Sequence, residues 1–168
     1  MTLLILYIAL AIGISFLCSM LEAVLLSITP TFTATIEEKK PRVASRIRQL
    51  KDDIDRPLSA ILSLNTIAHT VGAAGAGAQA QIVFGDAAVT VFSAVLTFLI
   101  LVLSEIIPKT LGALYWQSFA PAASRILPVL IWVMWPLVKM SQLITVLLSR
   151  GKPQPPVTRE EIVALADI

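Results

Sequence analysis

The sequence carries little charge, and this scarcity decides its class before any motif is considered. Only 14% of its 168 residues are charged and 57% are apolar, with a mean hydropathy of +0.84. A soluble domain has about a quarter of its residues charged and about half apolar. The composition therefore excludes an ordinary soluble domain and indicates a protein that lies in a lipid bilayer.

Cysteine and histidine are nearly absent, with Cys18 and His69 as the single residue of each type. One cysteine cannot form an internal disulfide, so it leaves the redox compartment open, and we interpret Cys18 as a small apolar packing residue. No zinc-ligand cluster is present. Neither a serine–histidine pair nor a second acid has catalytic spacing, so we expect no enzymatic activity.

A cleavable signal sequence is also missing. The first apolar run, 3–26, has no basic residue before it and no Ala-x-Ala-like site after it, so we expect it to be retained. Two further runs, 58–84 and 87–107, reach the ~20 residues that cross a ~30 Å hydrocarbon core. The predicted fold class is an all-α membrane protein with three transmembrane helices and additional juxtamembrane or interfacial helices.

Basic residues are absent near Asp86 and gather between the first two runs, where 37–56 holds seven of the thirteen. Basic loops mark the cytoplasmic side of a membrane. We therefore expect the N-terminus and Asp86 outside, and 37–56, Lys109 and the C-terminus inside, in a bacterial or archaeal plasma membrane. Because 37–56 also holds five acids, it is predicted to be a mixed-charge helix or hairpin and not a nucleic-acid-binding arm.

The stretch 113–149 is apolar but interrupted by prolines. Their spacing favours short, bent helices that are embedded in the membrane or lie at its interface and return to the cytoplasm, with tryptophans at headgroup depth. A fourth span is the alternative. The transmembrane module is thus expected over 1–150, and 151–168 is predicted to be a linker and the start of a cytoplasmic helix. We also expect the chain to be part of a longer protein.

Glu105 is the most informative residue, because it is the only acid in the run 87–107. A carboxylate at mid-bilayer costs about 2.5–3.5 kcal/mol on insertion scales. Pro108 has no backbone N–H, so the carbonyl oxygen of Ser104 loses its helical partner beside the acid, and we expect a discontinuous helix there. A carboxylate next to a free carbonyl suits a hard cation such as Mg²⁺, Ca²⁺ or Na⁺.

Two other polar side chains fall at a similar depth. At 1.5 Å per residue, Ser19 lies about 24 Å from the outer end of the first run, Asn65 about 10 Å from the inner end of the second, and Glu105 about 27 Å from the outer end of the third. This agreement predicts a metal site with Ser19, Asn65 and Glu105 as its ligands. Secondary candidates are Ser63, His69, which continues the helix face of Asn65, and Ser104.

Each of these residues also has a purely structural interpretation. Ser19 could bond back to its own helix, and Asn65 could join two helices. Glu105 could pair with Lys109, and Glu22 is more simply a partner of a basic loop residue than a ligand. His69 could pack without binding anything.

Three strings resemble the membrane module of the CNNM/CorC magnesium-transport proteins. They are Ser19-Met20-Leu21-Glu22-Ala23, the stretch 62–70, and Ser104-Glu105-Ile106-Ile107-Pro108-Lys109-Thr110, of which the last is the most specific. The resemblance covers essentially the whole chain. It implies a homodimer in the lipid bilayer, an inward-facing Mg²⁺ site, Na⁺-coupled export, and a cytoplasmic CBS-containing region in the full-length protein.

The chain departs from the family pattern at two positions of the expected site. His69 stands where the family generally has asparagine, and Ser104 stands where it has glycine. A neutral imidazole nitrogen suits transition metals better than Mg²⁺. The expected function is Mg²⁺ transport; the alternative is a non-transporting anchor or regulatory subunit in which the polar residues only hold helices together.

Small residues surround the middle of the second run, from Gly72 to Ala78. Gly72 and Ala76 continue the face of Asn65 and are expected to pack within the subunit. Ala74, Gly77 and Ala78 point roughly the opposite way. We expect them to meet a second copy of the chain at close approach.

Overall fold

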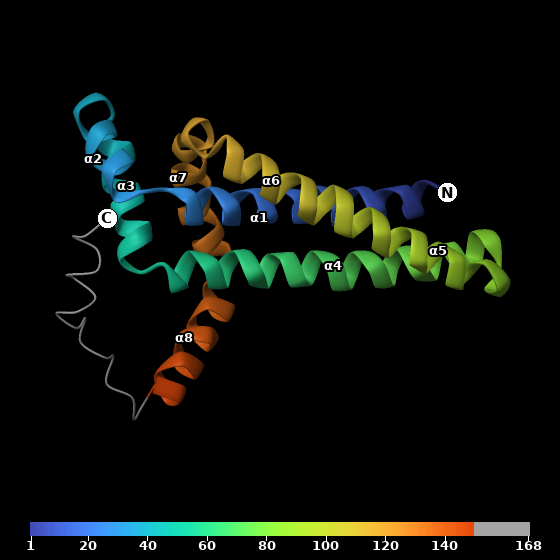
Figure 1. Ribbon diagram of the computed structural model, residues 1–168. Helices are drawn as coiled ribbons and strands as arrows, with labels where there is room; N and C mark the ends of the chain where they lie inside the picture. The colour runs from blue at the N-terminus through green and yellow to red at the C-terminus, as the bar shows by residue number, and fades with distance from the viewer. Residues whose placement is uncertain (150–168) are drawn as a thin grey trace, which may run out of the picture.

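The computed structural model describes residues 1–149, and helices account for nearly all of them (Figure 1). Over this range no β-strand forms, which confirms the all-α prediction. The predicted linker and helix start at 151–168 lie outside the described residues. The helices are α1 (Thr2–Ser27), α2 (Pro30–Lys39), α3 (Pro41–Asp52), α4 (Asp55–Phe84), α5 (Asp86–Leu99), the π-helix η1 (Ile100–Ile106), α6 (Ile107–Leu114), α7 (Trp116–Val133) and α8 (Trp135–Ser149).

Three long helical segments make the body of the molecule (Figure 1). α1 and α4 lie side by side and run in opposite directions. The continuous helix formed by α5, η1 and α6 packs on α4 at its start and on α1 at its end. α7 lies across the end that carries α2 and α3, and α8 diverges from the body.

Two of these segments are long and apolar enough to cross a membrane, namely Thr2–Ser27 and Asp86–Leu114. They contain the predicted spans 3–26 and 87–107. α4 is 30 residues long, about 45 Å, but its glycines, alanines and polar side chains make it less apolar. Its crossing, like the orientation of the ends relative to the membrane, stays a prediction.

The third segment does not break at Pro108, contrary to our expectation, and it continues to Leu114. The turns before Pro108 are wider than α-helical: Ile107 N–H donates to the Val102 carbonyl oxygen, five residues back. Pro108 then takes one of the first positions of α6, where a missing N–H costs little. The helix absorbs the proline by widening.

The predicted bends in 113–149 are fewer than the prolines suggest. Pro121 and Pro128 both lie inside α7, and the helices are interrupted at Tyr115 and at Met134, where α7 and α8 meet at 83°. Buried contacts of α7 with α1, α3 and α4 hold its proline-containing turns in place. The bend agrees with broken helices and disagrees with one straight fourth span.

The charged stretch after the first span forms a helical hairpin, as predicted. α2 and α3 are joined at Lys40, and Arg48 Nη2 lies 2.7 Å from Glu37 Oε2 across the hairpin. This ion pair is exposed, so it contributes at most about 1 kcal/mol. The apolar face of α3 supplies the anchorage, through the buried residues Val43, Ala44, Ile47 and Leu50.

Glycines allow α1 to approach its neighbours closely. A Cβ added at Gly72 would overlap the Cβ of Ala11 on α1. A Cβ added at Gly112 would lie 2.8 Å from the Met20 carbonyl oxygen. The expected packing of Gly72 and Ala76 within the subunit is confirmed, since both are buried.

The turn between α4 and α5 consists of Gly85 alone, with φ of 80°. A side chain would be strained in that conformation, so glycine is required there. Gln81 Nε2 donates to Asp86 Oδ1 across the turn at 2.7 Å. The chain therefore reverses from α4 to α5 within one residue, and this short turn sets the relative position of the two helices along their axes.

Candidate functional site

A polar cluster joins α1, α4 and η1 in the middle of the apolar body. Ser15 Oγ lies 2.6 Å from His69 Nε2 and 3.4 Å from the Ser104 carbonyl oxygen. His69 Nδ1 lies 3.9 Å from Glu105 Oε1. Ser15 is fully buried, whereas the side chains of His69 and Glu105 are 25% and 35% exposed. The cluster thus reaches from the helix interface to one side of the bundle.

Two of the predicted ligands lie one helical turn from this cluster. α1 and α4 are antiparallel, so the step from Ser15 to Ser19 and the step from His69 to Asn65 lead in the same direction, about 6 Å along the bundle. Ser19 Oγ and Asn65 Oδ1 are both buried, and neither has a hydrogen-bond partner among residues 1–149. Ser19 therefore does not bond back to its own helix, as its structural interpretation required.

An ion pair closes the cluster toward α2 and α3. Lys109 Nζ lies 3.4 Å from Glu22 Oε2. Lys109 therefore pairs with Glu22 and not with Glu105. Glu22 has a basic partner, as expected, but this partner lies on α6 and not in the 37–56 loop. Since Lys109 follows Glu105 by one turn, its pairing with Glu22 leaves the Glu105 carboxylate without a lysine partner among residues 1–149.

Of the remaining secondary candidates, Ser104 lies in the cluster and Ser63 lies outside it. The hydroxyl of Ser104 donates to the Ile100 carbonyl oxygen at 2.6 Å, so the Ser104 carbonyl oxygen and not its side chain meets Ser15. Because Pro108 has no N–H to donate, the Ser104 carbonyl oxygen can accept from Ser15 on the neighbouring helix. Ser63 faces a hollow between α4 and α8, on a different side of α4 from Asn65 and His69.

Ser15 was not among the predicted site residues, although a signal for it is visible. Ser15, Ser19 and Glu22 follow i, i+4, i+7 spacing, which places them on one face of α1. A serine in an apolar helix usually bonds to its own backbone, so it attracts little notice by itself. Only the position of His69 on the neighbouring helix reveals its contact.

The donor set suits a cation that accepts oxygen ligands. Within residues 1–149 no three histidine, cysteine or acidic side chains come together. Glu105 and His69 must therefore be completed by neutral groups, of which Ser19 Oγ and Asn65 Oδ1 are buried and available. Mg²⁺ is commonly held by one or two carboxylates together with neutral oxygens and water.

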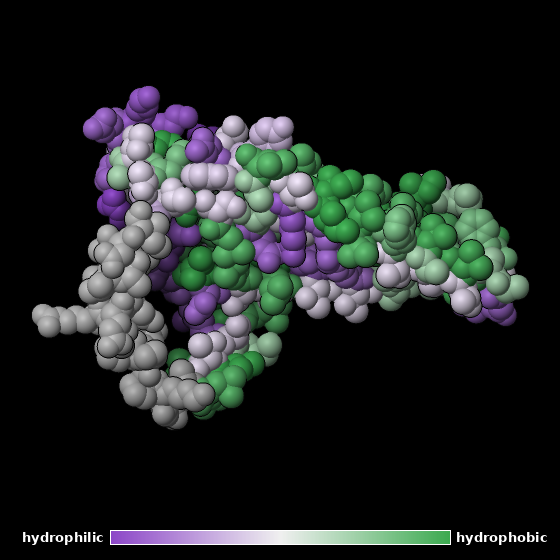
Figure 2. All heavy atoms as spheres, in the orientation of Figure 1, coloured by the Kyte–Doolittle hydropathy of each residue, from purple (hydrophilic) through white to green (hydrophobic). Residues whose placement is uncertain are grey.

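Hydrophilic residues interrupt the apolar surface midway along the bundle (Figure 2). Green, hydrophobic side chains cover the half that carries α5 and the N-terminus, and purple ones gather at the end that carries α2 and α3. The partial exposure of Glu105 and His69 agrees with a site that opens sideways.

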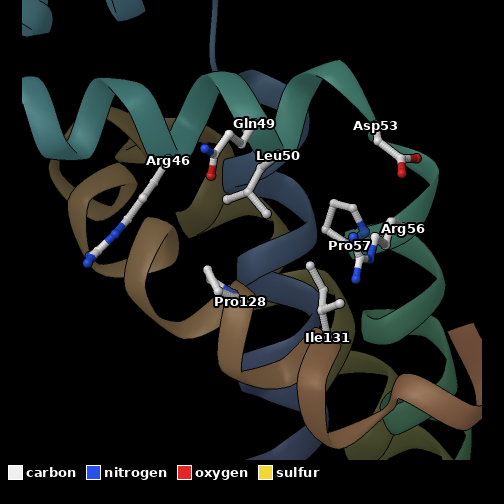
Figure 3. A pocket seen from close by; sticks show the side chains of 8 residues that line it. All are labelled: Arg46, Gln49, Leu50, Asp53, Arg56, Pro57, Pro128 and Ile131. Atoms are coloured by element: carbon white, nitrogen blue, oxygen red, sulfur yellow. The ribbon is translucent and has the colours of Figure 1, made fainter.

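A second hollow, of about 220 Å³, lies between α3, α4 and α7 (Figure 3). Leu50, Pro57, Pro128 and Ile131 form its floor, while the charged groups of Arg46 and Asp53 extend away from the centre (Figure 3). Polar atoms do not converge there as they do around His69. The cluster between α1, α4 and η1 is therefore the stronger candidate for a functional site.

Apolar helices of membrane-spanning length that enclose a partly buried polar cluster define a helical membrane protein. The chain belongs to the CNNM family: the family model described as the Cyclin M transmembrane N-terminal domain matches residues 5–168. The resemblance found in the sequence is thereby confirmed.

Curated relatives support the same assignment. A UPF0053 protein of Synechocystis sp. is 34% identical over 152 residues, which cover 90% of this chain and 44% of that protein. The UPF0053 inner membrane protein YfjD of Escherichia coli is 36% identical over 109 residues, or 65% of this chain and 26% of that protein. A UPF0053 protein of Haemophilus influenzae is 32% identical over 124 residues, or 74% of this chain and 30% of that protein. The chain thus spans less than half the length of these relatives.

Proposed function

We propose that this domain transports a divalent cation across the membrane, and that Mg²⁺, the ion implied by the family resemblance, is its substrate. The observation that carries the proposal is the pair of buried, unpartnered oxygens, Ser19 Oγ and Asn65 Oδ1, one helical turn from Ser15 and His69, of which His69 lies 3.9 Å from Glu105. A buried polar group without a partner costs about 1–3 kcal/mol in proteins. A bound cation would supply the missing partner for both.

The alternative role, a non-transporting anchor, accounts for less of the geometry. Residues that only hold helices together are expected to hydrogen-bond across the interface. Ser15 and His69 do so at 2.6 Å, whereas Ser19 and Asn65 do not. An anchor also gives no reason for an acid in an apolar helix whose nearest lysine pairs elsewhere.

The π-helix η1 is a second observation in favour of transport, because it places an irregular backbone segment at the site. Glu105 lies within η1, near the point where the π-helix passes into α6. π-helical turns are rare and occur frequently at functional sites. In transporters, a departure from regular α-helical geometry is often found at a central site that opens to each side in turn.

The finer features of the proposal rest on the loop charges and on the family resemblance. We place the N-terminus outside and the basic hairpin α2–α3 inside, so the ion enters from the cytoplasm and leaves in exchange for Na⁺. The Escherichia coli relative is named as an inner membrane protein, which agrees with a plasma membrane location. We also propose a cytoplasmic CBS-containing region in the full-length protein, and no enzymatic activity.

The first prediction distinguishes a transporter from an anchor. Purified protein in proteoliposomes that hold an internal Mg²⁺ indicator is expected to carry Mg²⁺ across the bilayer when a Na⁺ gradient is applied. The measurement is the indicator signal against protein-free vesicles and against vesicles with equal Na⁺ on both sides. Equal Mg²⁺ movement with and without protein would assign the anchor role.

The second prediction concerns a homodimer. Ala74 and Ala78 are exposed on α4, and within residues 1–149 no atom lies within 4 Å of a Cβ placed at Gly77. We propose that this face meets a second copy, so Ala74→Leu is expected to weaken the dimer by blocking close approach. Asn65→Ala should keep the dimer and lose the ion. Native mass measurement decides, and a dimer lost in Asn65→Ala but kept in Ala74→Leu would reverse the two faces.

A further inference from the structure

The hydrogen bonds of the cluster indicate which nitrogen of His69 carries hydrogen. The Ser104 carbonyl oxygen can only accept and lies 3.4 Å from the Ser15 hydroxyl, so we assign the single hydrogen of that hydroxyl to it. Ser15 Oγ must then accept at its other contact, from His69 Nε2–H at 2.6 Å. In the neutral ring the second nitrogen, Nδ1, therefore bears a lone pair.

That lone pair lies next to another acceptor. His69 Nδ1 and Glu105 Oε1 are 3.9 Å apart, and a carboxylate oxygen also offers only lone pairs. No basic side chain neutralises the carboxylate among the described residues, since Lys109 pairs with Glu22. A positive charge between Nδ1 and Oε1 would therefore stabilise both acceptors.

We propose that His69 Nδ1 is a direct ligand of the transported ion, and that this site consequently binds a divalent transition ion of the Mn²⁺–Zn²⁺ series more tightly than Mg²⁺. The inference rests on the proposed function, because it names the ion class of the same site. Imidazole nitrogen suits Fe²⁺, Ni²⁺ and Zn²⁺, affinity for nitrogen and oxygen sites rises from Mn²⁺ through Co²⁺ to Ni²⁺, and Mg²⁺ prefers oxygen ligands.

The surroundings of His69 match those of a metal-binding histidine. Such residues usually donate their other ring N–H to an acceptor that fixes the tautomer and the ring orientation. Ser15 performs that task here and is itself held by the Ser104 carbonyl oxygen. Bonds of about 2.0–2.2 Å would set a nitrogen and an oxygen ligand about 3.4 Å apart at a tetrahedral angle. The 3.9 Å gap therefore needs to close by only about half an ångström.

A nitrogen ligand can be detected without changing the sequence. Protein loaded with Mn²⁺ alone is examined by pulsed electron paramagnetic resonance, once with natural histidine and once with ¹⁵N-labelled histidine. We expect a ¹⁴N modulation that the label replaces, because His69 is the single histidine of the chain. The lack of any histidine nitrogen signal from bound Mn²⁺ would overturn the proposal.

Selectivity gives the second measurement, by thermal stabilisation titrated with Co²⁺ and with Mg²⁺. The wild-type protein should reach half-saturation at a Co²⁺ concentration at least about tenfold lower than for Mg²⁺, and His69→Asn should remove most of that preference. Ser15→Ala should weaken Co²⁺ binding about 10–100-fold while keeping the nitrogen signal, as expected of a positioning residue. The matched control is Thr66→Ala, which removes an exposed hydroxyl that donates to the Leu62 carbonyl oxygen of its own helix, and its preference should be unchanged.

The possible results distinguish a failure of this inference from a failure of the proposed function. If His69→Asn keeps the wild-type preference for Co²⁺, the inference fails while cation binding stands. If no divalent ion stabilises the wild-type protein, the proposed function fails first. A proton held between Nδ1 and Oε1 would give stabilisation that varies with pH but not with metal, and this result would also overturn the inference.

Discussion

Glu105→Gln is expected to abolish ion-dependent stabilisation and ion flux while the protein remains folded. The amide keeps the shape of the side chain but removes the negative charge that the cation requires. Removing one member of a close charge pair costs about 2–5 kcal/mol, more than about 30-fold in affinity. Folding should survive, because the carboxylate is 35% exposed and its nearest partner, His69, is 3.9 Å away.

The measurement is thermal unfolding in detergent with and without Mg²⁺ or Co²⁺, followed by flux in proteoliposomes. Glu22→Gln provides a matched control, since it removes an acid of the same cluster that already has Lys109 as its partner. It should lower basal stability slightly and keep the ion response. Unchanged stabilisation by either ion in Glu105→Gln would remove Glu105 from the site.

Gly72→Ala is expected to lower the stability of the fold strongly, although it adds only one methyl group. The new Cβ would overlap the Cβ of Ala11 and would lie 3.2 Å from its Cα, so α1 and α4 would have to separate. Overpacking of this kind costs about 1–3 kcal/mol. Ion binding should weaken too, because the same helix pair holds Ser15 against His69.

Two comparison variants isolate that clash. Gly13→Ala changes the same residue type on α1, where no atom of residues 1–149 lies within 4 Å of the added Cβ, and it should unfold at the wild-type temperature or above. Combining Gly72→Ala with Ala11→Gly moves the methyl group from one helix to the other and should restore most of the lost stability. Failure of this double variant to recover would show that the helices do not meet at these positions.

The sequence was sufficient to find the polar residues but not their partners. Glu105 and Asn65 stand out because polar groups in apolar runs are costly, and this cost does not depend on the fold. Ser15 does not stand out, because a serine is tolerated in any apolar helix. Pairings such as Lys109 with Glu22 depend on how far one helix slides along another, and no local pattern encodes that distance.

The helical segments were predictable to within a few residues, whereas their irregularities were not. Apolar runs that are long enough to cross a membrane predict α1 and the helix from α5 to α6. Pro108 indicated a break, yet the chain forms the π-helix η1 and continues. Whether a proline breaks a helix or widens it depends on packing, here of Pro108 and Gly112 against α1. The roles of Ser19, Asn65 and Glu105 as ligands stay predictions.

The single-residue turn at Gly85 makes the two ends of the bundle unequal as surfaces for recognition. At that end, the described chain offers other macromolecules only the turn itself and the first residues of α1. An antibody or a protease needs several residues of accessible backbone, which a turn braced by Gln81 and Asp86 does not provide. For residues 1–149 we therefore expect contacts with water-soluble partners mainly at the opposite end, on the charged hairpin of α2 and α3.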